Sequence, residues 1–187
     1  MLIIGFGHRA RQGKNVAADA IVDYYAEKRE TLRKHGLAPY RAPKAQSIGF
    51  ATALYEVCRN EYGMTEKDAP LLQRIGMERR ELDLDYWIKR AFANISPWTD
   101  IVLIPDLRFI NEAEYIKSKG GYLVDIKRLN ADGTQHIASD RPADHISETA
   151  LDDYPFDFYL TNSHGHQALL VEQAITLVEY LRGLEAR

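Results

Sequence analysis

The chain has 187 residues, of which 45% are hydrophobic and 27% are charged. We expect a single domain over residues 1–187, because this length and composition allow a real hydrophobic core and exclude a collagen-like, low-complexity or disordered chain. The 24 basic and 27 acidic side chains leave a formal net charge of −3, so no overall positive field attracts nucleic acid, and anions must be bound by local groups of donors.

Strand and helix patterns alternate along the chain. A short apolar run at 2–6 predicts a buried strand, and apolar residues at helical spacing predict a helix from 14 to about 33. A connection containing Gly and Pro at 35–43 leads to a weaker apolar stretch at 45–53. The later elements are expected as two helices within 66–96, a strand at 101–104, a helix at 111–119, a strand at 122–126, a polar loop or flap at 128–150, a strand at 156–161 and a helix at 166–182. Strands separated by helices indicate an α/β fold with a parallel sheet covered on both faces.

The single cysteine, Cys58, excludes an internal disulfide framework and a multi-cysteine zinc site. It lies in an apolar-periodic run, so we expect it to pack in the core. Residues 1–5 form too short an apolar run for a signal peptide, and no stretch approaches the ~20 apolar residues of a membrane span. These observations favour a cytoplasmic protein with no membrane partner.

The segment between the first strand and the first helix has features of a phosphate-binding loop, and we call residues 7–15 the glycine loop. Gly7 and Gly13 flank five residues, and Lys14 follows the second glycine. Backbone N–H groups of such a loop and of the helix N-terminus surround phosphates, and the lysine bridges the β- and γ-phosphates of a nucleotide.

Two positions of the glycine loop depart from the strict pattern. Only four residues usually separate the glycines, so His8 stands where a glycine is expected, and Asn15 replaces the Ser or Thr that contacts Mg²⁺. An alternative interpretation is a tight turn at Gly13 followed by a solvated lysine. Arg9 and Arg11 favour phosphate binding, because extra cations beside the loop help to hold a polyphosphate.

Four sequence blocks follow one another along the chain. They are Gly-Lys-Asn-Val-Ala-Ala-Asp at 13–19, Leu-Leu-Gln-Arg-Ile-Gly-Met-Glu-Arg-Arg at 71–80 with Asp-Tyr-Trp-Ile at 85–88, Asp-Leu-Arg-Phe-Ile-Asn-Glu-Ala-Glu at 106–114, and His-Ile-Ser-Glu-Thr at 145–149 with Asp-Asp-Tyr-Pro-Phe-Asp at 152–157. In this order they resemble the bacteriophage deoxynucleoside monophosphate kinases, over roughly residues 3–180. The departures lie at His8, Asn15 and Ile110, where relatives commonly have Gly, Asp or Ser/Thr, and Pro.

The resemblance implies a three-layer P-loop kinase fold with a five-stranded parallel sheet flanked by helices. It also implies a helical acceptor-binding region at about 55–98 and a lid at about 128–150. ATP would be the phosphoryl donor with Mg²⁺, and a deoxynucleoside monophosphate would be phosphorylated to the diphosphate. If the chain is phage-encoded, the expected location is the cytoplasm of the host cell.

Donor-side roles follow from the positions of the polar residues after the predicted strands. Phosphoryl transfer requires positioning and charge neutralisation, so Lys14 is the first catalytic candidate. Asp106 ends a predicted strand and is a candidate for holding Mg²⁺ with Asn15, the alternative being a cap for the helix that follows it. The remaining donor-side candidates are the loop residues Arg11, Gln12, Gly13, Asn15 and Val16, and Asn162 after the last strand, where a turn-forming role is the alternative.

Acceptor-side and lid roles fall on arginines. Arg108 is expected to meet a phosphate, the alternative being an ion pair with Glu112 at i, i+4. Arg141, and Arg128 at the start of the polar segment, are candidates for a flap that closes over the phosphates, and Arg141 is the catalytic candidate there. His145 and Glu148 are expected to order this flap. Acceptor-binding candidates in the 71–80 block are Gln73, Glu78, Arg79 and Arg80, with one of the two arginines binding the monophosphate and a charged helix surface as the alternative.

Three functions remain open from the sequence. The leading one is a deoxynucleoside monophosphate kinase acting on small-molecule nucleotides. The others are a P-loop phosphotransferase with a nucleoside or coenzyme-precursor acceptor, and a non-catalytic nucleotide-binding module, which His8 and Asn15 keep open. A homodimer through the helices at 66–96 is compatible with the pattern but not required by it.

Overall fold

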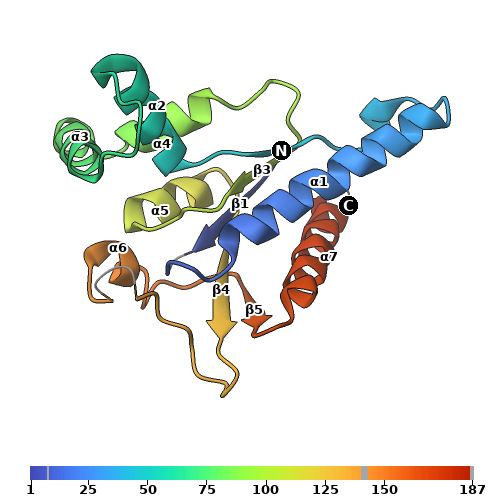
Figure 1. The fold of residues 1–187 in the computed structure, drawn as a ribbon. Coiled ribbons are helices and arrows are strands. Elements are labelled where there is room, and N and C mark those ends of the chain that lie inside the picture. Colours follow the sequence, from blue (N-terminus) through green and yellow to red (C-terminus); the bar gives the residue numbers. More distant parts are fainter. Residues whose placement is uncertain (8, 140–142, 186–187) are drawn as a thin grey trace.

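The computed structural model describes residues 1–7, 9–139 and 143–185 (Figure 1). Within these residues the strands form one parallel sheet of five, in the order β2-β3-β1-β4-β5. The strands are β1 (Leu2–Gly7), β2 (Ala45–Ser47), β3 (Ile101–Ile104), β4 (Tyr122–Leu129) and β5 (Phe158–Ser163). The helices are α1 (Lys14–Lys34), a 3-10 turn η1 (Pro39–Arg41), α2 (Phe50–Tyr62), α3 (Ala69–Leu82), α4 (Tyr86–Ala93), α5 (Ile110–Ser118), α6 (Ile146–Thr149) and α7 (Gln167–Glu185).

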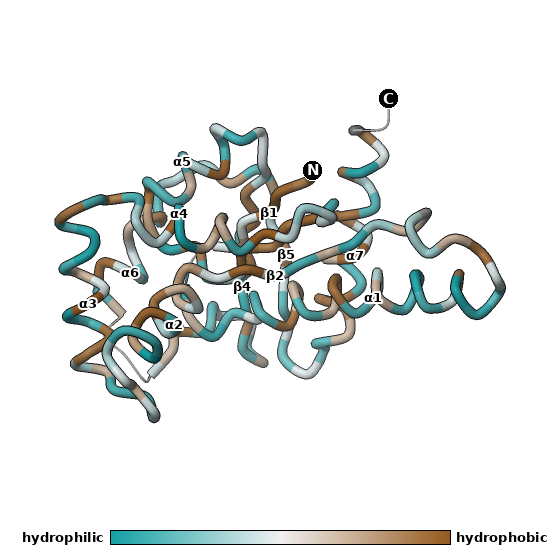
Figure 2. The backbone as a smooth tube through the Cα atoms, turned by 90° about the horizontal axis from the view of Figure 1, so that it is seen from above, coloured by the Kyte–Doolittle hydropathy of each residue, from teal (hydrophilic) through white to brown (hydrophobic). Residues whose placement is uncertain are grey.

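Helices cover both faces of the sheet, which confirms the predicted three-layer α/β fold. Figure 1 shows α1 and α7 together on one side and α2 to α5 on the other. Strand β1 explains why two layers are needed: Ile3 packs into the core cluster under α2 to α5, whereas Leu2 and Ile4 pack into the cluster under α1 and α7. Successive strand side chains point to opposite faces, so a strand made only of apolar residues must be covered on both faces of the sheet. Figure 2 accordingly shows the strands as a hydrophobic centre between more polar helices.

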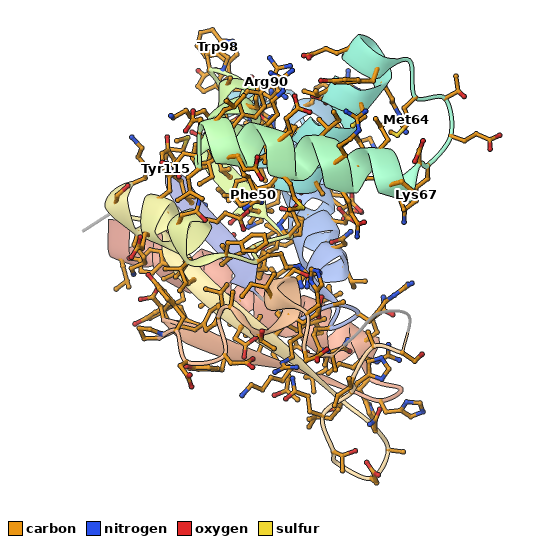
Figure 3. All side chains as sticks on the ribbon, turned by 90° about the vertical axis from the view of Figure 1, so that its left-hand side faces the viewer. Phe50, Met64, Lys67, Arg90, Trp98 and Tyr115 are labelled. Atoms are coloured by element: carbon orange, nitrogen blue, oxygen red, sulfur yellow. The ribbon has the colours of Figure 1, made fainter. Side chains whose placement is uncertain are left out.

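The predicted core position of Cys58 in the helical layer is confirmed. Cys58 is fully buried, and Trp87 is buried with its indole N–H donating to the carbonyl of Gly76 at 3.1 Å. Phe50, at the start of α2, is buried in the same cluster, whereas Trp98 stands at the outer end of this region in Figure 3 and is 81% exposed. Among the described residues, no helix is long and apolar enough to cross a membrane.

The weak apolar stretch at 45–53 contains two elements that the pattern did not separate. Residues Ala45–Ser47 form the edge strand β2, and only Ile48 and Gly49 separate it from α2. A three-residue strand is too short for an alternating pattern, so its pairing with β3 decides its conformation.

The last two strands end later than expected. β4 continues to Leu129 rather than 126, so the first two residues of the expected lid lie in the sheet, and β5 begins at Phe158 rather than 156 and continues to Ser163. The two strands pair in register from Val124↔Phe158 to Leu129↔Ser163. Ladder hydrogen bonds therefore extend both strands through polar residues that have low strand propensity by themselves.

Candidate functional site

A cavity of about 730 Å³ lies at the carboxyl ends of the strands, where the turns after β1, β3 and β5 come together. Its lining residues are Arg11, Gln12, Gly13, Lys14, Asn15, Val16, Pro105, Asp106, Arg108, Arg128, Asn162, Ser163, His164, Gly165 and Gln167. Four of these described side chains are those of Lys or Arg, and Asp106 is the one carboxylate among them. A cavity of this charge, next to the N-terminus of α1, is suited to a polyanion.

Two residues of the glycine loop have left-handed backbone conformations; His8 lies outside the described residues. Gly13 has φ +107°, and Arg11 has φ +60°, which is uncommon for a residue with a side chain. A Cβ on Gly13 would lie 2.7 Å from Nδ2 of Asn162 and 2.8 Å from Cδ2 of Leu170. Glycine is therefore required here both by the backbone conformation and by the closely packed side chains.

Gln12 and Asn162 hold the loop from the inside. The Gln12 side chain is buried; its amide donates to the carbonyls of Ala10 and His136 at 3.0 and 2.9 Å and accepts the N–H of Arg128 at 2.6 Å. The Asn162 amide donates to the Gln12 carbonyl at 2.9 Å. Both are predicted to bind the nucleotide; in the structure their amides connect the glycine loop to the ends of β4 and β5.

Lys14 is the most buried cation of the cavity. It is 5% exposed, and its Nζ donates to the carbonyl of Arg9. Burial, and secondly repulsion from the guanidinium of Arg108, lower the pKa of Lys14 to about 7, while the carboxylates of Glu148 and Asp106 act in the opposite direction. The structure therefore excludes the alternative of a solvated lysine.

Asp106 lines the cavity, and the alternative role of capping the following helix is wrong. Its Oδ1 accepts the N–H of Phe50 at 3.1 Å and its Oδ2 the N–H of Ala51 at 2.7 Å, so it caps α2 and not the following helix α5. Burial raises the pKa of Asp106 above its usual value, while the two N–H donors and Arg108 oppose that rise.

Asp106 and Asn15 line the same cavity and offer oxygen ligands, the type that Mg²⁺ prefers. In the described part of the chain, no group of three His, Cys, Asp or Glu side chains is arranged to hold a metal. The two residues fit a Mg²⁺ that takes its remaining ligands from phosphate oxygens and water, as this ion commonly does.

Arg108 is oriented by Glu148, and the alternative of an ion pair with Glu112 is wrong. Nη1 of Arg108 donates to Oε1 of Glu148 at 2.6 Å. The Glu112 carboxylate instead caps α5 by accepting the N–H groups of Arg108 and Phe109 at 2.8 and 3.1 Å. Its other oxygen accepts from Nη2 of Arg80 at 3.0 Å. Glu112 lies four positions after Arg108, but the Arg108 guanidinium reaches Glu148 instead.

The structure distinguishes the four acceptor-side candidates on α3. Arg80 points toward the start of α5, paired with buried Glu112 and stacked on the ring of Phe109 at 4.2 Å. Arg79 points toward α2, where its Nη2 donates to Glu61 at 3.1 Å. Glu78 forms an i, i+4 ion pair with Arg74 at 3.7 Å, and Gln73 is exposed. None of these four lines the 730 Å³ cavity.

Burial also acts on the Glu112 carboxyl behind Arg108. It raises the pKa of Glu112 to about 7, and the nearby Arg80 guanidinium opposes that rise. The carboxyl holds both the Arg80 side chain and the Arg108 backbone from this buried position.

The predicted lid residues are placed only in part. Arg141 lies outside the described residues. Arg128 lies in β4 and lines the cavity. His145 begins α6, where its Nδ1 accepts the N–H of Ser147 at 3.2 Å.

The sequence did not predict the hydrogen bonds between residues 145–157 and the glycine loop. Glu148 accepts the N–H of Ala10 at 2.7 Å, and Asp152 binds Nη2 of Arg9 with both oxygens at 2.7 Å. The late block, His-Ile-Ser-Glu-Thr followed by Asp-Asp, contained these carboxylates. Its position in the chain carried no information about the partner, because the contacts span 138 and 143 residues.

The comparison with known proteins is limited to distant structural neighbours. No protein-family model and no curated protein matches the sequence. A cysteine-to-alanine mutant of APS kinase from Mycobacterium tuberculosis is similar with a TM-score of 0.42 and 11% identity, over 97% of this chain and 96% of that chain. The same enzyme in complex with AMPPNP and APS has a TM-score of 0.40 and 11% identity, over 97% of each chain. The fold assignment therefore rests on the order and direction of this chain's own strands.

Proposed function

We propose that this protein is an ATP-dependent kinase that transfers the terminal phosphoryl group of ATP to a deoxynucleoside monophosphate. The observation that carries the proposal is the convergence of Arg11, Lys14, Arg108 and Arg128 on one cavity at the N-terminus of α1. A nucleotide triphosphate carries the negative charge that such a group would neutralise. The identity of the acceptor rests on the sequence resemblance.

The proposed roles follow the placement of each side chain. The backbone of the glycine loop from Arg11 to Val16 holds the donor phosphates, and Lys14 stabilises charge on the transferring group. Arg108 contacts the same group from the β3 side of the cavity. Asn15 and Asp106 would hold Mg²⁺, which when bound neutralises charge on the donor phosphates. Arg141 keeps its proposed role in the lid.

The acceptor is proposed to bind on the side of the cavity nearest to α3. Of the candidates there, Arg80 is the better placed to bind the acceptor phosphate. Its guanidinium pairs with Glu112, and the same carboxylate accepts the backbone N–H of Arg108. Gln73, Glu78 and Arg79 would need a movement of α3 to reach the same ligand. Closure of this kind on substrate binding is common among kinases.

A different acceptor is the second candidate function. The observation that favours it is that none of the four acceptor-side candidates on α3 lines the cavity. A nucleoside or a coenzyme precursor would then accept the phosphoryl group at the same donor site.

An acceptor panel tests the proposal. We expect ADP release from ATP and Mg²⁺ to be stimulated by at least one of the four deoxynucleoside monophosphates in a coupled assay. The ribonucleotides, nucleosides and coenzyme precursors serve as the comparison set. Stimulation only by a member of that set would replace the acceptor, and ATP binding without any stimulated release would leave a non-catalytic nucleotide-binding module.

Binding of the triphosphate is expected to take up a proton at Lys14. Its pKa of about 7 in the free protein lies below the 10.5 of an ordinary lysine, and a neighbouring polyphosphate favours the charged form. At about pH 8.5 the free side chain is mostly neutral and the bound one mostly charged. Calorimetry with AMPPNP in buffers of different ionisation enthalpy measures the uptake, and Lys14→Met should remove it. An equal uptake in the variant would contradict the assignment.

The depressed pKa of Lys14 also predicts how the stability of the free protein changes with pH. Because the folded-state pKa is depressed, the contribution of Lys14 to stability is fully present above pH 10.5 and is lost as pH falls to about 7. The free protein is therefore expected to lose less stability on acidification in this window once Lys14 is replaced by methionine. Urea unfolding of both proteins at several pH values across the window measures the difference.

A further inference from the structure

The carboxylate of Glu148 lies outside the cavity and contacts two groups that shape it. Glu148 is 4% exposed; its Oε2 accepts the N–H of Ala10 at 2.7 Å and its Oε1 accepts Nη1 of Arg108 at 2.6 Å. It borders a small void of about 10 Å³ together with Arg9, Ala10 and Gln12, and is not among the residues that line the 730 Å³ cavity. Its oxygens thus hold the glycine loop and Arg108 without occupying the space of a ligand.

The charge of Glu148 balances two cations that would otherwise repel each other. Arg108 lowers the pKa of Lys14 by repulsion, and among the carboxylates that raise this pKa Glu148 has the largest effect. Two cations in one cavity cost free energy unless a fixed negative charge compensates for them. A carboxylate placed behind the cavity provides this compensation and leaves the cavity itself open to an anion.

The other carboxylates near Arg108 have different partners. Glu112 binds Arg80 and two backbone N–H groups, and Asp106 binds the N-terminus of α2. Among the described carboxylates, Glu148 is therefore the one that contacts the guanidinium of Arg108. The carbonyl of Ser147, a weaker acceptor of the same Nη1 at 3.3 Å, adds to this orientation.

We propose that Glu148 is a positioning residue for the polyphosphate site, which aligns Arg108 and the Ala10 segment of the glycine loop before the ligand arrives. This inference rests on the proposed function for the nature of the ligand. It gives the late segment around α6 a defined role, because Glu148 then fixes two walls of the cavity that come from the turns after β1 and β3.

The first test is titration calorimetry with inorganic triphosphate. We expect Glu148→Gln to weaken its binding about tenfold or more, because the amide has a single acceptor oxygen for the two donors and removes the carboxylate that Arg108, 19% exposed, contacts at 2.6 Å. The matched control is Asp153→Asn, from the same segment, whose exposed carboxylate is not bonded to the described part of the glycine loop; it is expected to stay within about twofold. Unchanged or tighter binding by a folded Glu148→Gln protein would overturn the proposal.

A double-mutant cycle separates positioning from a general loss of structure. If Glu148 acts through Arg108, adding Arg108→Gln to Glu148→Gln should cost much less affinity than Arg108→Gln alone. Full additivity of the two losses would overturn the proposal. Glu148→Asp, which keeps the charge but is too short to reach both donors, should give an intermediate loss and replaces Glu148→Gln if that variant does not fold.

A second readout needs no ligand. In ¹⁵N NMR spectra of the free protein, we expect distinct guanidinium signals of Arg108, assigned with Arg108→Gln, to merge in Glu148→Gln because the side chain is released. Identical Arg108 signals in both proteins would overturn the inference. If the wild-type chain binds no triphosphate, the proposed function fails, and this readout alone still decides whether Glu148 orients Arg108.

Discussion

Replacement of Lys14 by methionine is expected to lower the rate constant of phosphoryl transfer by about 10³-fold. Methionine fills a similar volume and keeps the packing of a side chain that is 5% exposed, but it removes the positive charge from the phosphate site. Folding should survive, because burial already disfavours the charged lysine. The measurement is coupled ADP release with the best acceptor of the panel, together with a thermal unfolding curve.

Lys28→Met is the matched control for this prediction. Lys28 lies on the same helix as Lys14, is outside the cavity and forms an exposed ion pair with Glu179 at 3.3 Å. Its replacement is expected to leave the rate within about twofold, since exposed ion pairs contribute little. Turnover of Lys14→Met at the rate of the control would remove Lys14 from the mechanism.

Replacement of Gly13 by alanine is expected to destabilise the protein by about 3 kcal/mol and to abolish tight nucleotide binding. The new Cβ would face Nδ2 of Asn162 at 2.7 Å and Cδ2 of Leu170 at 2.8 Å while the backbone holds φ +107°. Relief of these contacts must move the glycine loop or Asn162, and either shift misplaces the N–H groups at the start of α1. Thermal or urea unfolding and calorimetry with AMPPNP measure the two effects.

Gly36→Ala separates backbone strain from crowding. Gly36 also has a left-handed conformation, with φ +68°, but a Cβ there would meet nothing within 4 Å. We therefore expect a loss of only about 1 kcal/mol and unchanged nucleotide affinity. Equal effects of the two substitutions would show that the contacts with Asn162 and Leu170 do not matter.

Particular elements show how far the sequence predicted the fold. Apolar runs such as 101–104 and helical patterns such as 14–33 led to the α/β class and its parallel sheet, because each signal depends on neighbouring residues. The edge strand β2 and the polar ends of β4 and β5 were missed or shortened. Their conformation depends on pairing with a neighbouring strand, which is set by residues distant in the sequence.

For the candidate site, the sequence by itself determined that a glycine loop with Lys14 joins a strand to a helix and that Asp106 and Arg108 follow another strand. The parallel order of β1 and β3 then places these residues at one edge of the sheet. Only the tertiary structure decided the partners: Asp106 caps α2, Arg80 rather than Arg79 pairs with Glu112, and Glu148 contacts Arg108. The physical reason is the range of each interaction. Strand and helix periodicity is local, whereas a contact such as that between Glu148 and Ala10 spans 138 residues and exists only when the folded chain brings both groups together.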